Sequence, residues 1–137
     1  MGMAPLTALR ALDRLSDEDM VNVQRCNLLD SAAPNPSVEV LLHAFLPHTF
    51  IDHSHADAIL SLVSQRDAER ILAEVFGDRL AIVPYVMPGF ALAKLAAEVA
   101  EAHPECEGLL LLQHGLFTFG ATARESYERH IAAVSAA

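Results

Sequence analysis

The fold class follows from residues 108–119, which read GLLLLQHGLFTF. Two apolar, strand-like runs, Gly108–Gln113 and Leu116–Phe119, flank the pair His114-Gly115, and this spacing predicts a β-hairpin. Glycine adopts left-handed backbone angles freely, and histidine tolerates them better than most residues, which favours a turn at this pair. The stretch therefore predicts that the chain contains a sheet.

Helical and strand-like patterns lie on both sides of the hairpin. The expected order is helix, helix, strand, helix, helix, strand, helix, strand, strand, helix, which is typical of an α/β (α+β layered) domain. We expect one domain over residues 1–137, with a central, largely antiparallel sheet flanked by helices. The other expected elements are a helix opened by the capping box Ser16–Asp19, a helix from Ser37 to Pro47, a strand over Thr49–His55, helices over Ala56–Gln65 and Asp67–Phe76, a strand over Arg79–Tyr85, a helix over Phe90–Ala102 and a last helix from Thr122 or Ala123.

Composition excludes several classes of protein. Nine basic and 18 acidic residues give a net charge of −9, and Lys94 is the only lysine, so no basic face is expected to bind nucleic acid. No apolar stretch is long enough to cross a bilayer, and no basic segment leads into an apolar one as in a secretory signal. Cys26 and Cys106 form no close motif and fit a reduced, cytoplasmic chain.

Seven histidines are unusual in an acidic chain of this length. His53 and His55 project from the same face of the expected strand, while Ser54 points the other way. Two such imidazoles can share one metal ion, and His114, at the hairpin turn, is the best placed third ligand. Three neutral histidines with an open position are typical of catalytic zinc sites. The alternative is that these histidines are simply exposed or hydrogen-bonded.

Glu39 lies two residues after Ser37, in the first turn of the expected helix. An acidic residue there stabilises the helix dipole in any protein, but it could also be a carboxylate that transfers a proton beside the metal. His43 follows one turn later and could orient that carboxylate or only occupy a polar edge. His103 is explained as a partner of a helix C-terminus, and His48 and His130 are not expected to be ligands.

Four segments together resemble the class II aldolase/adducin family, and most closely the aldolase half of bifunctional rhamnulose-1-phosphate aldolase/short-chain dehydrogenase proteins. The combination of an acidic helix, an H-x-H strand and a distant His-Gly pair is specific, although each part alone is weak. The likeness extends from about residue 10 to near the end of the chain. The segments are Pro36–Pro47, Asp52–Ala58, Tyr85–Phe90 and Gln113–Gly120.

The resemblance implies that His53, His55 and His114 hold Zn²⁺, or another divalent cation, and that Glu39 is the catalytic acid/base. It implies cleavage of a ketose 1-phosphate, such as rhamnulose 1-phosphate, to dihydroxyacetone phosphate and lactaldehyde. A divalent cation suits this reaction because it stabilises the charge of the enediolate that cleavage leaves. The implied partners are a small phosphorylated sugar and further copies of the same chain in a homo-oligomer.

The chain departs from the family at one point. Members carry glycine- and serine-rich phosphate-binding loops before the acidic helix, and we find none here, so we expect a partial domain lacking that upstream portion. No substrate-binding residue is assigned. Two alternatives stay open, namely a non-catalytic, adducin-like assembly module and an epimerase or dehydratase that acts on a sugar phosphate through the same metal-enediolate chemistry.

Overall fold

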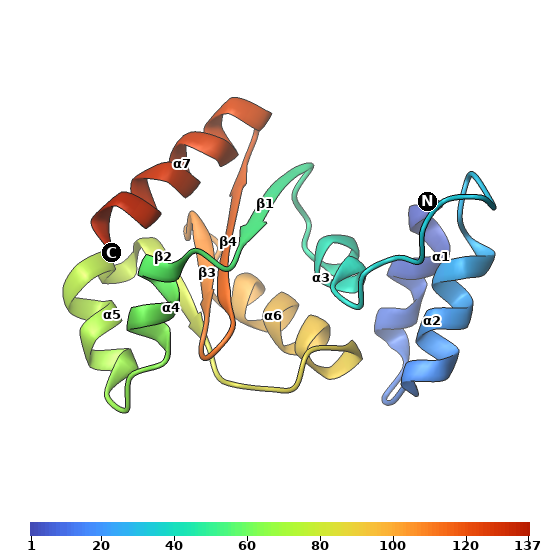
Figure 1. The fold of residues 1–137 in the computed structure, drawn as a ribbon, viewed down its shortest axis with the longest axis horizontal. Coiled ribbons are helices and arrows are strands. Elements are labelled where there is room, and N and C mark those ends of the chain that lie inside the picture. The colour runs from blue at the N-terminus through green and yellow to red at the C-terminus, as the bar shows by residue number, and fades with distance from the viewer. The chain divides into compact units, whose positions relative to one another are not determined.

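The chain folds into two compact units (Figure 1). The computed structural model describes all residues from 1 to 137. The first unit contains residues 1–47 and 86–97, and the second contains residues 48–85 and 98–137. The elements in chain order are α1 (Met3–Ala8), the short 3-10 helix η1 (Leu9–Ala11), α2 (Asp17–Cys26), α3 (Val40–Phe45), β1 (Phe50–Ser54), α4 (Asp57–Val63), α5 (Ala68–Phe76), the 3-10 helix η2 (Gly77–Arg79), β2 (Leu80–Val83), α6 (Phe90–Ala102), β3 (Gly108–Leu111), β4 (Gly115–Gly120) and α7 (Ala123–Ala136).

The first unit contains α1, α2 and α3, together with the first part of α6. The Ser16 hydroxyl accepts a hydrogen bond from the Asp19 amide at 3.1 Å and caps α2, as the capping box predicts. The Thr7 hydroxyl donates to the Ala44 carbonyl at 3.3 Å and links α1 to α3. Apolar side chains from all four helices are buried in the unit and include Leu6, Met20, Leu41 and Phe90.

The second unit contains a four-stranded sheet with the order β1-β4-β3-β2. β4 is antiparallel to both of its neighbours, whereas β2 runs parallel to β3. The parallel pair needs a long crossover, and α6 lies in the connection between its two strands. The expected layered fold with a largely antiparallel sheet is confirmed, with the sheet mixed because of β2.

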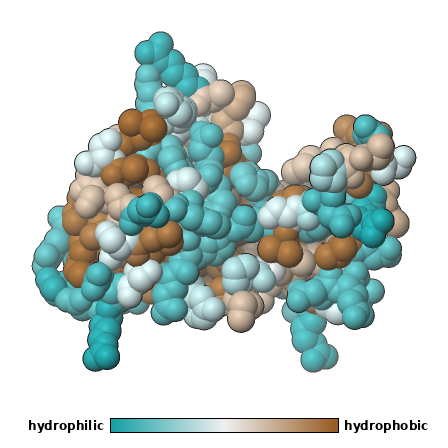
Figure 2. Space-filling model, viewed as in Figure 1, coloured by the Kyte–Doolittle hydropathy of each residue, from teal (hydrophilic) through white to brown (hydrophobic).

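Three helices, α4, α5 and α7, cover one face of this sheet. Leu110 and Leu116, which are paired across β3 and β4, point toward these helices, and Leu72 and Phe76 of α5 complete the same buried cluster. The outer side of the helices is mixed, and Figure 2 shows hydrophobic side chains among hydrophilic ones over them. Since side chains alternate along a strand, Phe117 points to the opposite face of the sheet.

The helix before β1 begins later than the sequence predicts. We expected Ser37 to cap it and Glu39 to lie in its first turn, but α3 begins at Val40 and Glu39 is its N-cap residue. The Ser37 hydroxyl accepts from the amide of Glu39, two residues on, at 3.1 Å. The Val40 amide donates to the Ser37 carbonyl at 3.1 Å, so residues 37–40 form a turn that precedes α3.

Two strand ends also differ from the prediction. β1 ends at Ser54, so His55 lies just beyond it, since Ser54 pairs with Leu116 near the start of β4 and the ladder ends there. In the hairpin, the residue with a left-handed backbone is Gln113, with φ of 57°, and not His114 or Gly115. The Gln113 amide donates to the Val63 carbonyl at 3.1 Å, and this contact with the end of α4 holds the turn in place.

None of the helices combines the length and the apolar character that a membrane crossing requires.

Candidate metal centre

His53 lies on β1 and points away from the face that α7 covers. Its ring stacks on that of Phe117, with centroids 3.9 Å apart and an interplanar angle of 13°. Its Nδ1 lies 2.9 Å from the Leu116 carbonyl oxygen. A carbonyl can only accept, so this contact places the proton on Nδ1 and leaves a lone pair on Nε2. A backbone partner of this kind is typical of histidines that bind metal through the other nitrogen.

His55 meets His53 although it lies one residue beyond the strand. The two ring centroids are 4.6 Å apart, and the two Nε2 atoms are separated by 3.0 Å. His55 is exposed, whereas His53 is half-buried. The i, i+2 spacing therefore brings two imidazole nitrogens together, as the sequence predicts.

His114 joins this pair from the turn between β3 and β4. Its ring centroid lies 5.4 Å from that of His53 and 5.0 Å from that of His55. The next residue, Gly115, lies against the end of β1, where a Cβ would come within 2.9 Å of the His55 ring. The close packing of this turn on β1 therefore needs glycine at position 115.

The three imidazoles fit a divalent metal ion. One nitrogen from each ring lies within 4.8 Å of those from the others. Zn–N bonds of about 2.0–2.1 Å in a tetrahedron place neighbouring ligand nitrogens about 3.3 Å apart, close to the 3.0 Å between the His53 and His55 nitrogens. Imidazole nitrogens suit zinc and other first-row metals, so the donor set does not distinguish among these ions.

Glu39 belongs to the first unit, whereas all three histidines belong to the second. It is half-buried at the start of α3, and its side chain does not cap that helix. The structure thus brings His53, His55 and His114 together within one unit.

The remaining histidines of the second unit have other partners. His48 stacks on Phe119 with centroids 4.1 Å apart, and burial, followed by the positive charge of Arg129, lowers its pKa. Nδ1 of His103 lies 3.0 Å from the Val99 carbonyl at the end of α6, in keeping with its predicted place at a helix C-terminus. His130 contacts two hydroxyl groups, Ser54 and Thr118, which no sequence pattern indicated.

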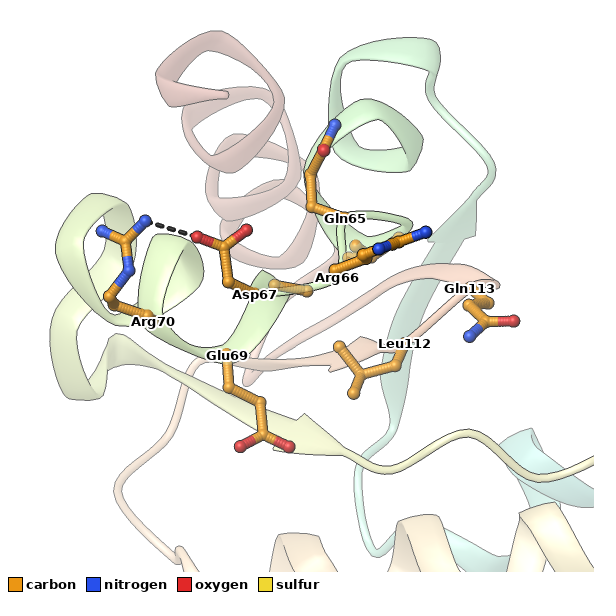
Figure 3. A pocket seen from close by; sticks show the side chains of 9 residues that line it. Gln65, Arg66, Asp67, Glu69, Arg70, Leu112 and Gln113 are labelled. Carbon is orange, nitrogen blue, oxygen red and sulfur yellow. Dashed lines mark hydrogen bonds and ion pairs between the residues drawn. The ribbon is translucent and has the colours of Figure 1, made fainter.

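A cavity of about 390 Å³ lies beside the β3–β4 turn (Figure 3). The end of α4, the loop that follows it and the first turn of α5 line it together with Leu112 and Gln113, which precede His114 in the chain. Its charged residues have both signs, and Arg70 pairs with Asp67 at 2.5 Å. This mixed charge gives the cavity no clear preference for an anionic group.

Similar proteins place the chain in a family. The profile of the class II aldolase and adducin N-terminal domain matches residues 9–137. The chain is 41% identical over 125 residues to YuxG of Bacillus subtilis, which is named an uncharacterized oxidoreductase. The matched region is 91% of this chain but only 18% of that protein.

Solved structures show the same fold. The N-terminal class II aldolase domain of a conserved protein from Thermoplasma acidophilum superposes with a TM-score of 0.88 at 40% identity, covering 98% of this chain and 62% of that one. An aldolase II superfamily protein from Pseudomonas syringae has a TM-score of 0.60 at 18% identity, covering 79% of this chain and 47% of that one. With nearly its whole length matched by the family profile, the chain belongs to the class II aldolase and adducin family.

Proposed function

We propose that this chain is the metal-binding part of a class II aldolase-type lyase that cleaves a ketose 1-phosphate. His53, His55 and His114 would hold the ion, Zn²⁺ or another divalent cation. The observation that carries the proposal is the meeting of three imidazoles, in which the Nδ1 contact of His53 with the Leu116 carbonyl turns its Nε2 toward His55. Three neutral ligands leave the positive charge of a divalent ion available to a substrate.

The proposed reaction breaks a carbon–carbon bond next to a carbonyl group. Negative charge develops on the substrate oxygens during cleavage, and a bound divalent ion supplies the charge that stabilises it. We assign the accompanying proton transfer to Glu39 on the strength of the family resemblance, since a carboxylate is a suitable general acid/base for this step. Rhamnulose 1-phosphate, which would give dihydroxyacetone phosphate and lactaldehyde, is the substrate that we propose from the resemblance.

The test combines metal analysis with a cleavage assay on the purified chain. Zinc content is measured after dialysis, and release of dihydroxyacetone phosphate from rhamnulose 1-phosphate is followed by a coupled assay. We expect about one zinc ion per chain and metal-dependent cleavage, both lost in His53→Ala and both kept in His103→Ala. Zinc binding without cleavage of any ketose 1-phosphate would support the metal centre but contradict the lyase assignment.

A further inference from the structure

On the α7 face of the sheet, a chain of hydrogen bonds reaches the residue between His53 and His55. Nε2 of His130 lies 2.6 Å from the Ser54 hydroxyl, and Nδ1 of His130 lies 2.9 Å from the Thr118 hydroxyl. His130 is on α7, Ser54 is the last residue of β1, and Thr118 is on β4. One imidazole therefore connects a helix to both strands that adjoin the metal centre.

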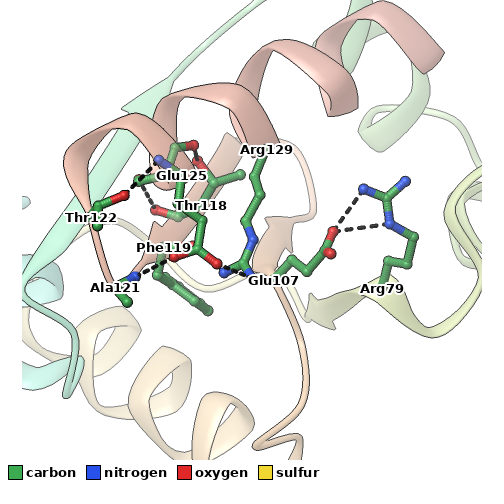
Figure 4. Close-up of polar contacts among 9 residues, drawn as sticks. Arg79, Glu107, Thr118, Phe119, Ala121, Thr122, Glu125 and Arg129 are labelled. Carbon is green, nitrogen blue, oxygen red and sulfur yellow. Dashed lines mark hydrogen bonds and ion pairs between the residues drawn. The ribbon is translucent and has the colours of Figure 1, made fainter.

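The hydrogen-bond series ends at a buried, doubly bonded pair of residues on the side away from Ser54. Thr118 and Ser126 are fully buried and are joined by two bonds, since the Thr118 hydroxyl donates to the Ser126 carbonyl at 3.1 Å and the Ser126 hydroxyl donates to the Thr118 carbonyl at 3.2 Å. Figure 4 shows this junction of β4 with the start of α7, where Arg129 also donates to the Phe119 carbonyl. His130 is thus anchored on a part of the unit that is fixed by buried bonds.

The directions of the bonds follow from this anchor. The single hydroxyl proton of Thr118 goes to Ser126, so the Thr118 oxygen accepts from the Nδ1–H group of His130. Nε2 of His130 then accepts the Ser54 hydroxyl proton. Both ring nitrogens of a neutral imidazole are satisfied in this way, and burial lowers the pKa of His130, which favours that neutral form.

Ser54 transmits this anchoring to the metal ligands. Its side chain points to α7, whereas that of His53 points to the opposite face, so fixing Ser54 fixes the backbone between the two ligands. From the other side, Gly115 packs against the Ser54 carbonyl, where a Cβ would come within 2.5 Å of the oxygen. We propose that His130 is a positioning residue, which holds His53 and His55 ready for the ion by binding the Ser54 hydroxyl.

The inference rests on the proposed metal centre, and zinc affinity tests it. The dissociation constant is measured by competition with a chelator. We expect Ser54→Ala and His130→Ala each to weaken zinc binding about 10- to 100-fold, as loss of an outer partner of metal ligands usually does. The double variant should bind zinc no more weakly than whichever single variant has the lower zinc affinity, since the two residues act through one bond. Ser54→Thr keeps the hydroxyl and should restore affinity.

Matched controls separate positioning from a general loss of stability. Ser61→Ala and His103→Ala remove a hydroxyl and an imidazole elsewhere in the same unit and should leave zinc affinity unchanged. Amide hydrogen exchange of the metal-free protein gives a second readout: we expect faster exchange at residues 53–55 in Ser54→Ala, with β2 and β3 unchanged.

The outcomes are distinguishable. Wild-type affinity in Ser54→Ala and His130→Ala would overturn the role of His130 alone. So would exchange that becomes faster to the same degree in all four strands, because this would show only a loss of stability. A wild-type chain that binds no zinc would overturn the metal centre itself and the inference with it.

Discussion

Gly115 lies so close to Ser54 that a Cβ on it would come within 2.5 Å of the Ser54 carbonyl oxygen. The same atom would lie 2.9 Å from the ring of His55. The hairpin turn that carries His114 and the strand end that carries the other two histidines therefore touch at a position where only glycine fits.

Gly115→Ala should consequently damage the metal centre. We expect a loss of about 1–3 kcal/mol in unfolding free energy from the forced displacement, measured by urea denaturation, and weaker zinc binding by chelator competition. Gly2→Ala is the control, since its added Cβ would meet nothing closer than 3.9 Å. Unchanged zinc affinity in Gly115→Ala would show that this contact does not set the place of His55.

Removal of His114 should abolish stoichiometric metal. His114→Ala leaves two imidazoles, and two neutral ligands hold a divalent ion far less tightly than three. Metal analysis after dialysis should show about one zinc per chain in the wild type and much less in the variant. His103→Ala should keep the wild-type content; full zinc content in His114→Ala would place the ligands elsewhere.

Glu39→Gln separates an acid/base from a ligand. If Glu39 transfers the proton, the variant keeps its zinc and its fold, and cleavage falls about 10²- to 10⁴-fold. Turnover and zinc content are measured on the same preparation. Loss of zinc together with activity would instead make Glu39 a ligand, and full activity would end its assignment to catalysis.

Stability should fall when the protein is acidified below pH 6.5. Burial is the main cause that lowers the pKa of both His48 and His130 below 6.5 in the folded state. At pH values between the ordinary histidine pKa of 6.5 and the lower folded-state pKa, the unfolded chain binds more protons than the folded chain does. The free energy of unfolding therefore decreases as pH falls through this range. Urea denaturation of the metal-free protein at a series of pH values measures the slope, and His48→Phe should make it shallower. An identical slope in this variant would contradict the assignment to His48.

Gln24→Met should stabilise the first unit. Gln24 is fully buried on α2, and neither polar atom of its side chain has a hydrogen-bond partner. Replacing an unsatisfied amide with an apolar side chain of similar length should raise the free energy of unfolding by about 1–3 kcal/mol. Gln65→Met, at an exposed position, should change it by less than about 0.5 kcal/mol. A destabilised Gln24→Met would indicate that the amide has a role that its surroundings do not explain.

Much of the fold could be predicted because it depends on local patterns. The capping box at Ser16 and the amphipathic run Phe90–Ala102 both correspond to helices with the expected start or bounds. The start of α3 could not be predicted in this way, since serine is as common in turns as at helix caps, and Ser37 begins a turn that delays the helix to Val40. The left-handed residue of the hairpin is Gln113 because the end of α4 holds its amide, a contact that lies far along the chain.

The candidate site shows the same division. The spacing of His53 and His55 is enough to predict that their imidazoles meet, because it reflects the two-residue period of a strand. The hairpin pattern makes His114 the best placed third ligand, but its contact with the other two histidines depends on the pairing of β1 with β4, which no local pattern indicates. The hydrogen bond between Ser54 and His130 joins residues 76 positions apart, and no periodic pattern in the sequence can predict a contact between such distant residues.

The pairing of β1 with β4 also affects the order of folding. The β3–β4 hairpin is local and can form early, whereas β1 must find β4 across a long loop, as the 63-residue separation of His53 and Leu116 shows. Closing such a loop costs entropy before any contact compensates for it, so β1 is expected to dock late. The three imidazoles come together only at that step. An ion bound to them would therefore slow the release of β1 more than it would speed the early steps, and would extend the lifetime of the native state.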